Sequence, residues 1–313
     1  MLLKKEAKTI KKSSNFPSYI LCLCGLNDGR LAIGGNSLVI YNMKSYKIDI
    51  FIDDFSNIVI PLKGNKLFYS QIAVSSEGPW IDESVSCHLI EFSKNDYVDK
   101  TDILPNNPDY NILHELSDNT LLVGRYHKEQ NNDIRDRIVK LIKNGEKYEV
   151  ALNMKADGLI NFVILKNNIF AVLRNNVSNV LCFYEIDSFK CVKNQFVSPE
   201  TNIISVLNEK YMLIGSDKEI ILYDYINYKS KEKIKCDYLY VLYKIYINNY
   251  KVFICETGGS KNQIIEYEFD NDGKYKKIYV YLNPQKKLKD LTLIKDGRLI
   301  TCSEENVKIW YDK

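Results

Sequence analysis

The N-terminus of the chain lacks a secretory signal, and the chain has no run long enough to cross a membrane. Only two apolar residues follow Met1 before lysines begin, so the apolar central region of a signal peptide is absent. The longest apolar runs, such as Tyr19–Cys24 and Phe162–Leu165, are far shorter than the roughly 20 residues that span a bilayer. We therefore expect a soluble protein of the cytoplasm, with the nucleus as the alternative.

The chain also lacks an excess of charge of one sign. Lys and Arg total 43, Asp and Glu total 40, and the formal net charge is +3. Non-specific binding to a phosphate backbone normally needs a clear basic excess. We expect neither nucleic acid nor a membrane surface as a partner.

None of the eight cysteines belongs to a C-x-x-C pair, which makes a zinc site or a disulfide framework unexpected. Cys22 and Cys24 place two sulfurs on one face of a predicted strand, but a tetrahedral zinc site needs four ligands and no second pair exists. We expect reduced thiols packed in the core, and neither a metal nor a cofactor.

Catalytic signatures are missing as well. The chain has three histidines, His88, His114 and His127, and none lies in a nucleophile, zinc-protease, P-loop or dinucleotide motif. Gly258-Gly259-Ser260-Lys261 resembles a phosphate cradle only superficially, because no helix follows it. We predict a protein that is not an enzyme and has no catalytic residues.

What the chain does contain is a repeat of short strands. Helical periodicity is nearly absent, while runs of Val, Ile, Leu, Tyr and Phe alternate with small polar turns. Three segments align almost without gaps, and each predicts a strand, a tight turn and a second strand ending in an aromatic residue. They are residues 29–42, 210–224 and 297–312.

Four weaker copies fill the intervals, and a hairpin turn of Asn, Asp or Gly precedes every copy. The turns at Asp28 and Asp296 lie 268 residues apart, so six intervals give about 45 residues per repeat, the length of a four-stranded propeller blade. We predict an all-β, seven-bladed β-propeller in one domain, residues 1–313. The predicted blades are about 18–53, 56–102, 109–153, 157–197, 201–236, 237–282 and 287–313, after a closing strand within 1–13.

The pattern resembles the WD40 repeat family, most clearly in residues 296–303 and in Val307-Lys308-Ile309-Trp310. The chain departs from that family because no blade carries a Gly-His dipeptide and Tyr311 separates Trp310 from Asp312. The resemblance implies a seven-bladed propeller that acts as a non-catalytic scaffold or adaptor for protein partners. It does not imply that the hydrogen-bonded Asp-His-Ser/Thr-Trp network of well-formed repeats is present.

The last blade needs a strand from elsewhere, because the chain ends soon after that blade's third strand. Residues Lys4–Lys12 precede the first complete blade and are placed to supply the missing strand beside residues 306–311. Such a closure would remove an exposed sheet edge.

Polar residues recur where the inner strands of the blades begin, and such a ring could hold a cation in a central channel. The simpler interpretation is that Asn and Asp close the turns before these strands. The residues are Asn57, Asn111, Asp157, Asn202, Asp237 and Asp290.

Long insertions concentrate in blades two and three, where we expect loops over 73–84 and 126–136 beside the interblade loop 103–109. Trp80, Tyr126 and Arg135 in these insertions are residue types enriched in interface hot spots, and they are our candidate partner-binding residues. The alternative is that Trp80 folds back onto its own blade. We expect a monomeric propeller within a complex; a structural subunit of a large assembly and a channel-based enzyme or small-ligand binder remain alternatives.

Overall fold

The computed structural model describes most of the chain, in two compact units. It covers residues 2–4, 6–10, 14–75, 82–105, 110–116, 119–125, 136–175, 178–216, 219–235, 242–248, 251–258, 261–283 and 288–311. Unit 1 comprises residues 1–5, 156–287 and 313, and unit 2 comprises residues 6–155 and 288–312. The assignment of 1–313 to a single domain stays a prediction.

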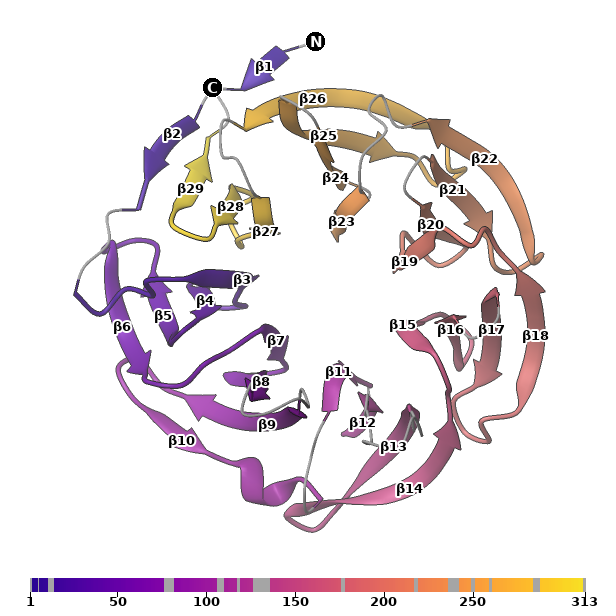
Figure 1. The fold of residues 1–313 in the computed structure, drawn as a ribbon, viewed down its shortest axis with the longest axis horizontal. Coiled ribbons are helices and arrows are strands. Elements are labelled where there is room, and N and C mark those ends of the chain that lie inside the picture. Colours follow the sequence, from indigo (N-terminus) through magenta and orange to yellow (C-terminus); the bar gives the residue numbers. More distant parts are fainter. Residues whose placement is uncertain are drawn as a thin grey trace. The chain divides into compact units, whose positions relative to one another are not determined.

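Unit 2 contains four sheets, and consecutive strands are neighbours in all of them except where β2 lies beside β29 (Figure 1). A 3-10 turn, η1 (Thr101–Ile103), follows the second sheet. The strands of the four sheets are β3 (Ile20–Gly25), β4 (Leu31–Gly35), β5 (Leu38–Asn42) and β6 (Lys47–Ile52); β7 (Ile58–Leu62), β8 (Lys66–Ser75), β9 (Asp82–Phe92) and β10 (Tyr97–Asp99); β11 (Tyr110–Glu115), β12 (Thr120–Arg125), β13 (Arg137–Asn144) and β14 (Lys147–Lys155); and β27 (Leu288–Leu293), β28 (Leu299–Ser303), β29 (Val307–Trp310) and β2 (Glu6–Thr9).

Unit 1 contains three sheets built in the same way. Their strands are β15 (Leu159–Ile164), β16 (Ile169–Asn175), β17 (Asn179–Glu185) and β18 (Cys191–Phe196); β19 (Thr201–Val206), β20 (Tyr211–Ser216), β21 (Glu219–Asp224) and β22 (Lys229–Lys235); and β23 (Leu242–Asn248), β24 (Lys251–Gly258), β25 (Lys261–Phe269) and β26 (Tyr275–Asn283), with the short β1 (Leu2–Lys4) beside β26.

The fold class is the predicted one. Each sheet contains four antiparallel strands, which is the blade of a propeller, and the described residues form seven such blades. The four strands follow chain order except in the last blade, where β2 follows β29. We number the blades from the N-terminus, so that β3–β6 form blade one and β27–β29 with β2 form blade seven. Gly258 pairs with Lys261 across a hairpin, so the supposed phosphate cradle joins two strands.

The predicted closure of the last blade is confirmed. Strand β2 runs antiparallel to β29, with Glu6 opposite Trp310 and Thr9 opposite Lys308. The N–H of Ile10 donates to the carbonyl of Val307 at 2.9 Å, and the buried Ile10 side chain packs in the same core cluster as Val307. The sequence did not predict β1, which adds a parallel fifth strand to blade six through Leu2, Leu3 and Lys4.

The core lies between the faces of neighbouring blades. One cluster joins Cys22, Cys24 and Ile40 of blade one to Leu67 and Ile90 of blade two. The two sulfurs lie in this apolar cluster, as the strand alternation predicts, and each Sγ is near a backbone carbonyl. Of the described cysteines, Cys87, Cys182 and Cys302 are also buried, but Cys191 on the outer strand β18 is exposed, so the expectation of core thiols is wrong for that residue.

Trp310 is buried in blade seven, with 2% of its surface exposed. Its indole Nε1 donates a hydrogen bond to the Thr301 hydroxyl at 3.0 Å, joining β29 to β28. The Thr-Trp half of the network found in well-formed WD40 repeats is therefore present in this blade. The contact is present although the Gly-His dipeptide is absent from the sequence.

Replacing Trp310 with alanine should lower the free energy of unfolding by about 3 to 5 kcal/mol, the usual cost of truncating a large buried aromatic residue. Urea unfolding monitored by far-UV circular dichroism measures the change, because this signal reports the backbone and does not depend on Trp310 fluorescence. Trp310→Phe keeps most of the ring volume and loses only the hydrogen bond, so its loss should be smaller. A Trp310→Ala loss below about 1 kcal/mol, typical of surface changes, contradicts the buried position.

Deleting residues 1–13 should cause aggregation or a large fall in the thermal midpoint, because β29 would then present an unpaired edge. Deleting only residues 2–5 removes β1 and leaves β2 in place, so blade seven should stay closed. Differential scanning calorimetry with light scattering compares the two truncations. An unchanged melting curve for the longer deletion would show that β2 does not close the blade.

Candidate functional site

The β8–β9 hairpin of blade two is longer than its neighbours. These strands have 10 and 11 residues, whereas β4 and β5 of blade one have five each. Pairing continues from Gln71 opposite Ser86 to Ser75 opposite Asp82. The prediction of a loop over 73–84 is therefore wrong at both of its ends, because residues 73–75 pair with residues 82–84 as strands.

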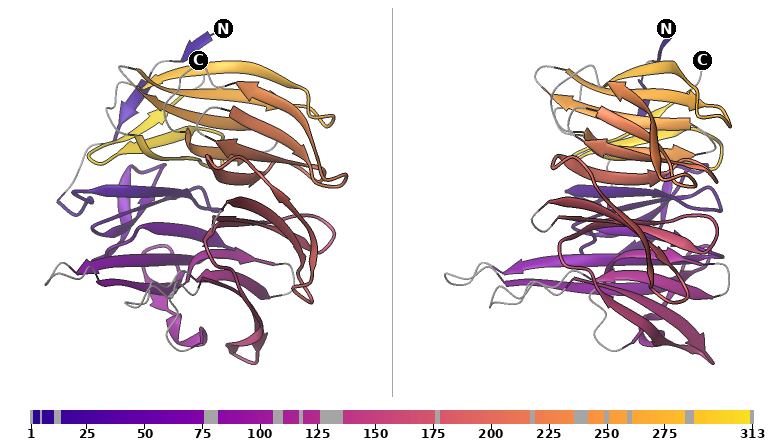
Figure 2. Two further views of the ribbon diagram at one scale, coloured as in Figure 1. Left: turned by 45° about the vertical axis from the view of Figure 1, so that its right-hand side comes forward. Right: turned by 90° about the vertical axis from the view of Figure 1, so that its right-hand side faces the viewer.

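We call residues 71–75 and 82–86 the arm. Five residues of strand at about 3.4 Å each give the arm a length of about 17 Å. Figure 2 shows β8 and β9 continuing past the ends of the strands beside them. The pairing of β7 with β8 ends at Ile58 opposite Ser70, and the pairing of β10 with β9 ends at Asp99 opposite Ile90. Within the described residues, the arm is thus a two-stranded ribbon.

A polar cluster fastens the base of the arm to the turn between blades one and two. The Tyr69 hydroxyl donates to Asp54 Oδ2 at 2.9 Å, and the Gln71 amide donates to Asp54 Oδ1. The His88 ring stacks on Tyr69 with 4.8 Å between centroids. Tyr69 and Gln71 come from β8 and His88 from β9, so the carboxylate in the interblade turn holds β8 directly and β9 through the ring stack of His88 on Tyr69.

The Asp54 cluster positions the strands and does not activate a reactive group. Burial raises the pKa of the Tyr69 phenol, and the hydrogen bond to the Asp54 carboxylate and its negative charge raise it further. The phenol therefore stays protonated as a donor and is not activated as a nucleophile or base. The His88 Nε2 lies 3.7 Å from Asp54 Oδ2, beyond hydrogen-bond distance.

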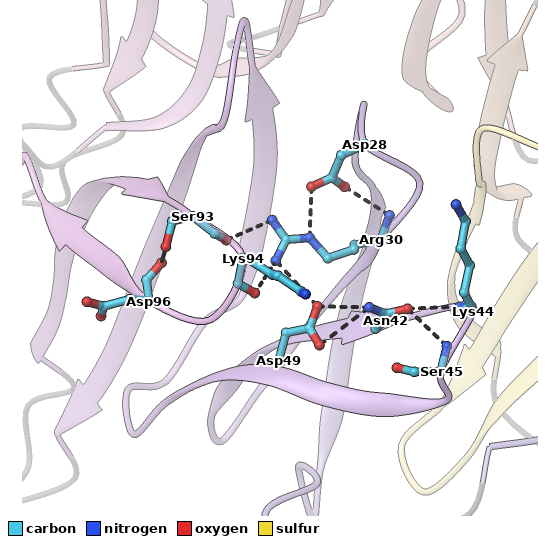
Figure 3. Close-up of polar contacts among 9 residues, drawn as sticks. All are labelled: Asp28, Arg30, Asn42, Lys44, Ser45, Asp49, Ser93, Lys94 and Asp96. Carbon is cyan, nitrogen blue, oxygen red and sulfur yellow. Dashed lines mark hydrogen bonds and ion pairs between the residues drawn. The ribbon is translucent and has the colours of Figure 1, made fainter.

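Arg30 fastens the other end of β9 (Figure 3). Its Nη1 and Nη2 donate to the carbonyls of Lys94 and Ser93, both at 3.0 Å, in the turn after β9. Its Nε donates to Asp28 at 2.8 Å, and the guanidinium lies 4.8 Å from the Phe92 ring centroid. Only 11% of this side chain is exposed, so a nearly buried cation of blade one holds the turn of blade two.

The pairing of Arg30 with Asp28 recurs elsewhere in the chain. Asp28-Gly29-Arg30-Leu31 is repeated as Asp296-Gly297-Arg298-Leu299. In both copies the Asp carboxylate accepts the N–H and the Nε–H of the arginine. The hydrogen bond from Arg298 holds the pKa of Asp296 below its usual value. The repeated tetrapeptide was a sequence signal for this contact, whereas nothing in the sequence marked Asp54.

The three candidate partner-binding residues, Trp80, Tyr126 and Arg135, lie outside the described residues. Trp80 falls between the ends of the arm at Ser75 and Asp82, and the other two fall between β12 and β13. Their role in partner binding stays a prediction.

The candidate channel residues divide among several roles. Asp290 is buried on β27, and its carboxylate accepts the N–H groups of Leu291 and of Leu23 on β3, at 2.7 and 2.8 Å. It therefore joins blade seven to blade one through the backbone. Asp157 precedes β15, Asn202 lies on β19, and the Asn57 N–H donates to the Ser70 carbonyl. Asp237 and the side chain of Asn111 are outside the described residues.

Among the residues that the structure describes, no three acidic, histidine or cysteine side chains come together in a way suited to a metal ion. In the same part of the chain, no helix is long and apolar enough to cross a membrane.

Comparison with known proteins identifies the fold. The WD40 β-propeller domain of Doa1 superposes with a TM-score of 0.68 at 12% sequence identity, over 99% of this chain and 97% of that domain. The chain has the WD40 β-propeller fold. A chain of the mitotic checkpoint complex matches with a TM-score of 0.63 at 11% identity, over 99% of this chain and 95% of that one. The computationally designed protein Ika8 matches at 0.60 and 12% identity, over 98% and 100%.

Comparison by sequence finds no relatives. No protein-family profile matches the chain. No curated protein matches it by sequence. The WD40 assignment therefore rests on the backbone, on the repeat pattern and on contacts such as Thr301–Trp310.

Replacing Arg30 with lysine should lower the free energy of unfolding by about 1.5 to 3 kcal/mol, because one ammonium cannot reproduce a fork that reaches Asp28 and two carbonyls. Chemical denaturation measures the change. Lys295→Ala, at an exposed turn position, is the matched control and should stay within about 0.5 kcal/mol of the parent. Equal stability of Arg30→Lys and the parent would show that the fork is dispensable.

Proposed function

We propose that the chain is a non-catalytic protein-interaction scaffold whose partner docks on the extended hairpin of blade two and the adjacent insertion of blade three. The observation that carries this proposal is the arm itself. A ribbon about 17 Å long adds nothing to the pairing of its own blade, because the four-stranded pairing ends at Ser70 and Ile90.

The way the arm is held supports the proposal. The Asp54 cluster holds its base and Arg30 holds the far end of β9, so the ribbon stands on fixed, mostly buried polar contacts. Binding sites are commonly loops or hairpins presented by a rigid scaffold. In the sequence, Trp80 lies at the end of this ribbon, and a large amphipathic side chain is a frequent interface anchor.

The described polar clusters favour a scaffold over an enzyme. The Asp54 carboxylate is occupied by Tyr69 and Gln71, and the Asp290 carboxylate by two backbone N–H groups. Both arrangements position backbone and strands. In the Asp54 cluster the pKa of the Tyr69 phenol is raised, whereas the pKa of an activated nucleophile would be lowered.

Replacing Trp80, Tyr126 and Arg135 together with alanine should abolish partner recovery in a pull-down while the thermal midpoint stays close to that of the parent. Single anchors are commonly worth about 2 kcal/mol of binding free energy or more, and positions between strands add little to the core. Affinity purification with quantitative mass spectrometry measures recovery.

The control is the double variant Asn27→Ala and Lys295→Ala, whose positions lie in first-to-second-strand turns at the other end of the blades. It should keep every partner. A folded triple variant that also keeps every partner contradicts the proposed function. A triple variant that unfolds would assign Trp80 to the packing of its own blade.

A further inference from the structure

We infer that the β9 edge of the arm binds an extended, basic polypeptide segment by strand addition. The inference deepens the proposed function and rests on it, because it names the partner chemistry for the same hairpin. It depends on three features of the arm: the direction of its backbone groups, its charge, and the behaviour of another edge in the same chain.

The backbone of β9 determines which groups face outward. The N–H of Leu89 donates to the Thr101 hydroxyl at 3.0 Å, and its carbonyl accepts the N–H of Lys100 at 2.7 Å, so Leu89 faces away from β8. Backbone direction alternates along a strand, so Val85 and Glu83 also turn their N–H and C=O groups away from β8. In the described part of the chain, no third strand pairs with β9 at these positions.

The charge of the hairpin selects the sign of the partner. From Leu67 to Ser93 the chain has four carboxylic acids and no lysine or arginine, although the whole chain has 43 of these basic residues. Asp82 and Glu83 lie on the β9 edge itself. Natural edge strands are commonly protected by lysine, and this one is not. Opposite charges on facing strands stabilise pairing, so a segment with alternating lysine or arginine fits this edge.

Another blade of the same chain accepts an added strand. Residues Leu2, Leu3 and Lys4 form β1, which pairs in parallel with Tyr279, Val280 and Tyr281 on the outer strand of blade six. A short segment from outside the four-stranded blade thus pairs with its outer strand in register. The β9 edge offers the same groups with no segment of the described chain beside them. Strand addition of this kind is a general mode of peptide recognition.

The test uses the full chain and a fluorescein-labelled synthetic peptide of alternating lysine and valine, six residues long, in fluorescence polarisation at low salt. Three protein variants and two control peptides separate backbone pairing from charge. Val85→Pro removes an outward N–H of β9 while leaving the β8–β9 ladder intact, because proline is tolerated where its nitrogen faces outward. Val74→Pro is the matched control on β8, where Ser70 and hence Val74 face away from β9.

We expect Val85→Pro to weaken peptide binding about tenfold or more, and Val74→Pro to leave it unchanged, because only the β9 edge loses a ladder position. The double variant Asp82→Lys and Glu83→Lys should weaken binding of the basic peptide by a similar factor and increase binding of a peptide with glutamate in place of lysine. Methylation of alternate peptide nitrogens should abolish binding although the charge is unchanged.

Other results overturn the inference. The inference fails if the basic peptide does not bind, or if its binding survives both Val85→Pro and nitrogen methylation. It also fails if only Val74→Pro loses peptide binding. A dimer of the parent protein that Val85→Pro dissociates would assign the edge to a second copy. If these tests fail while the Trp80, Tyr126 and Arg135 variant still loses its partners, the inference fails and the proposed function stands. If that variant keeps every partner, the proposed function itself fails.

Discussion

The pairing of backbone groups at sheet edges is the constraint on which the rest of this structure depends. Every four-stranded blade has two edges, and each edge carries N–H and C=O groups that need partners. At the inner edge of blade one, the side chains of Asp290 and Thr292 accept the N–H groups of Leu23 and Gly25. At the outer edges of blades seven and six, β2 and β1 supply whole strands.

Contacts between blades follow from the same requirement. Arg30 satisfies two carbonyls in the turn of blade two, and Asp54 fastens an interblade turn to the hairpin that follows it. These polar groups are buried or half-buried, and each has several hydrogen-bond partners. Such networks specify one arrangement of neighbouring blades, which hydrophobic packing alone does not. The apolar clusters between blade faces supply the hydrophobic stabilisation. The hydrogen bonds of Arg30 and Asp54 define how neighbouring blades are aligned.

The arm of blade two is a place where backbone groups at a sheet edge have no paired strand among the described residues. Its two strands pair with each other and, among the described residues, with nothing else. Isolated two-stranded ribbons are only marginally stable in water. The Asp54 contacts compensate by holding the ribbon at its base, and Arg30 holds the opposite end of β9 within the sheet. A scaffold that keeps an open, acidic edge beside a firmly anchored base is suited to accept a strand from another chain.

The sequence by itself determined the strand repeat, the number of blades and the closing strand. Apolar alternation, turn residues and a spacing of about 45 residues can be recognised in a single sequence, without an alignment. It also contained the repeated Asp-Gly-Arg-Leu that forms the clasp of Arg30. Tertiary structure alone decided that residues 73–75 and 82–84 pair as strands, that Asp54 meets Tyr69 and Gln71, and that β1 joins blade six. These outcomes depend on groups distant in the chain, and hydrogen-bond partners across a fold leave no periodic trace in the sequence.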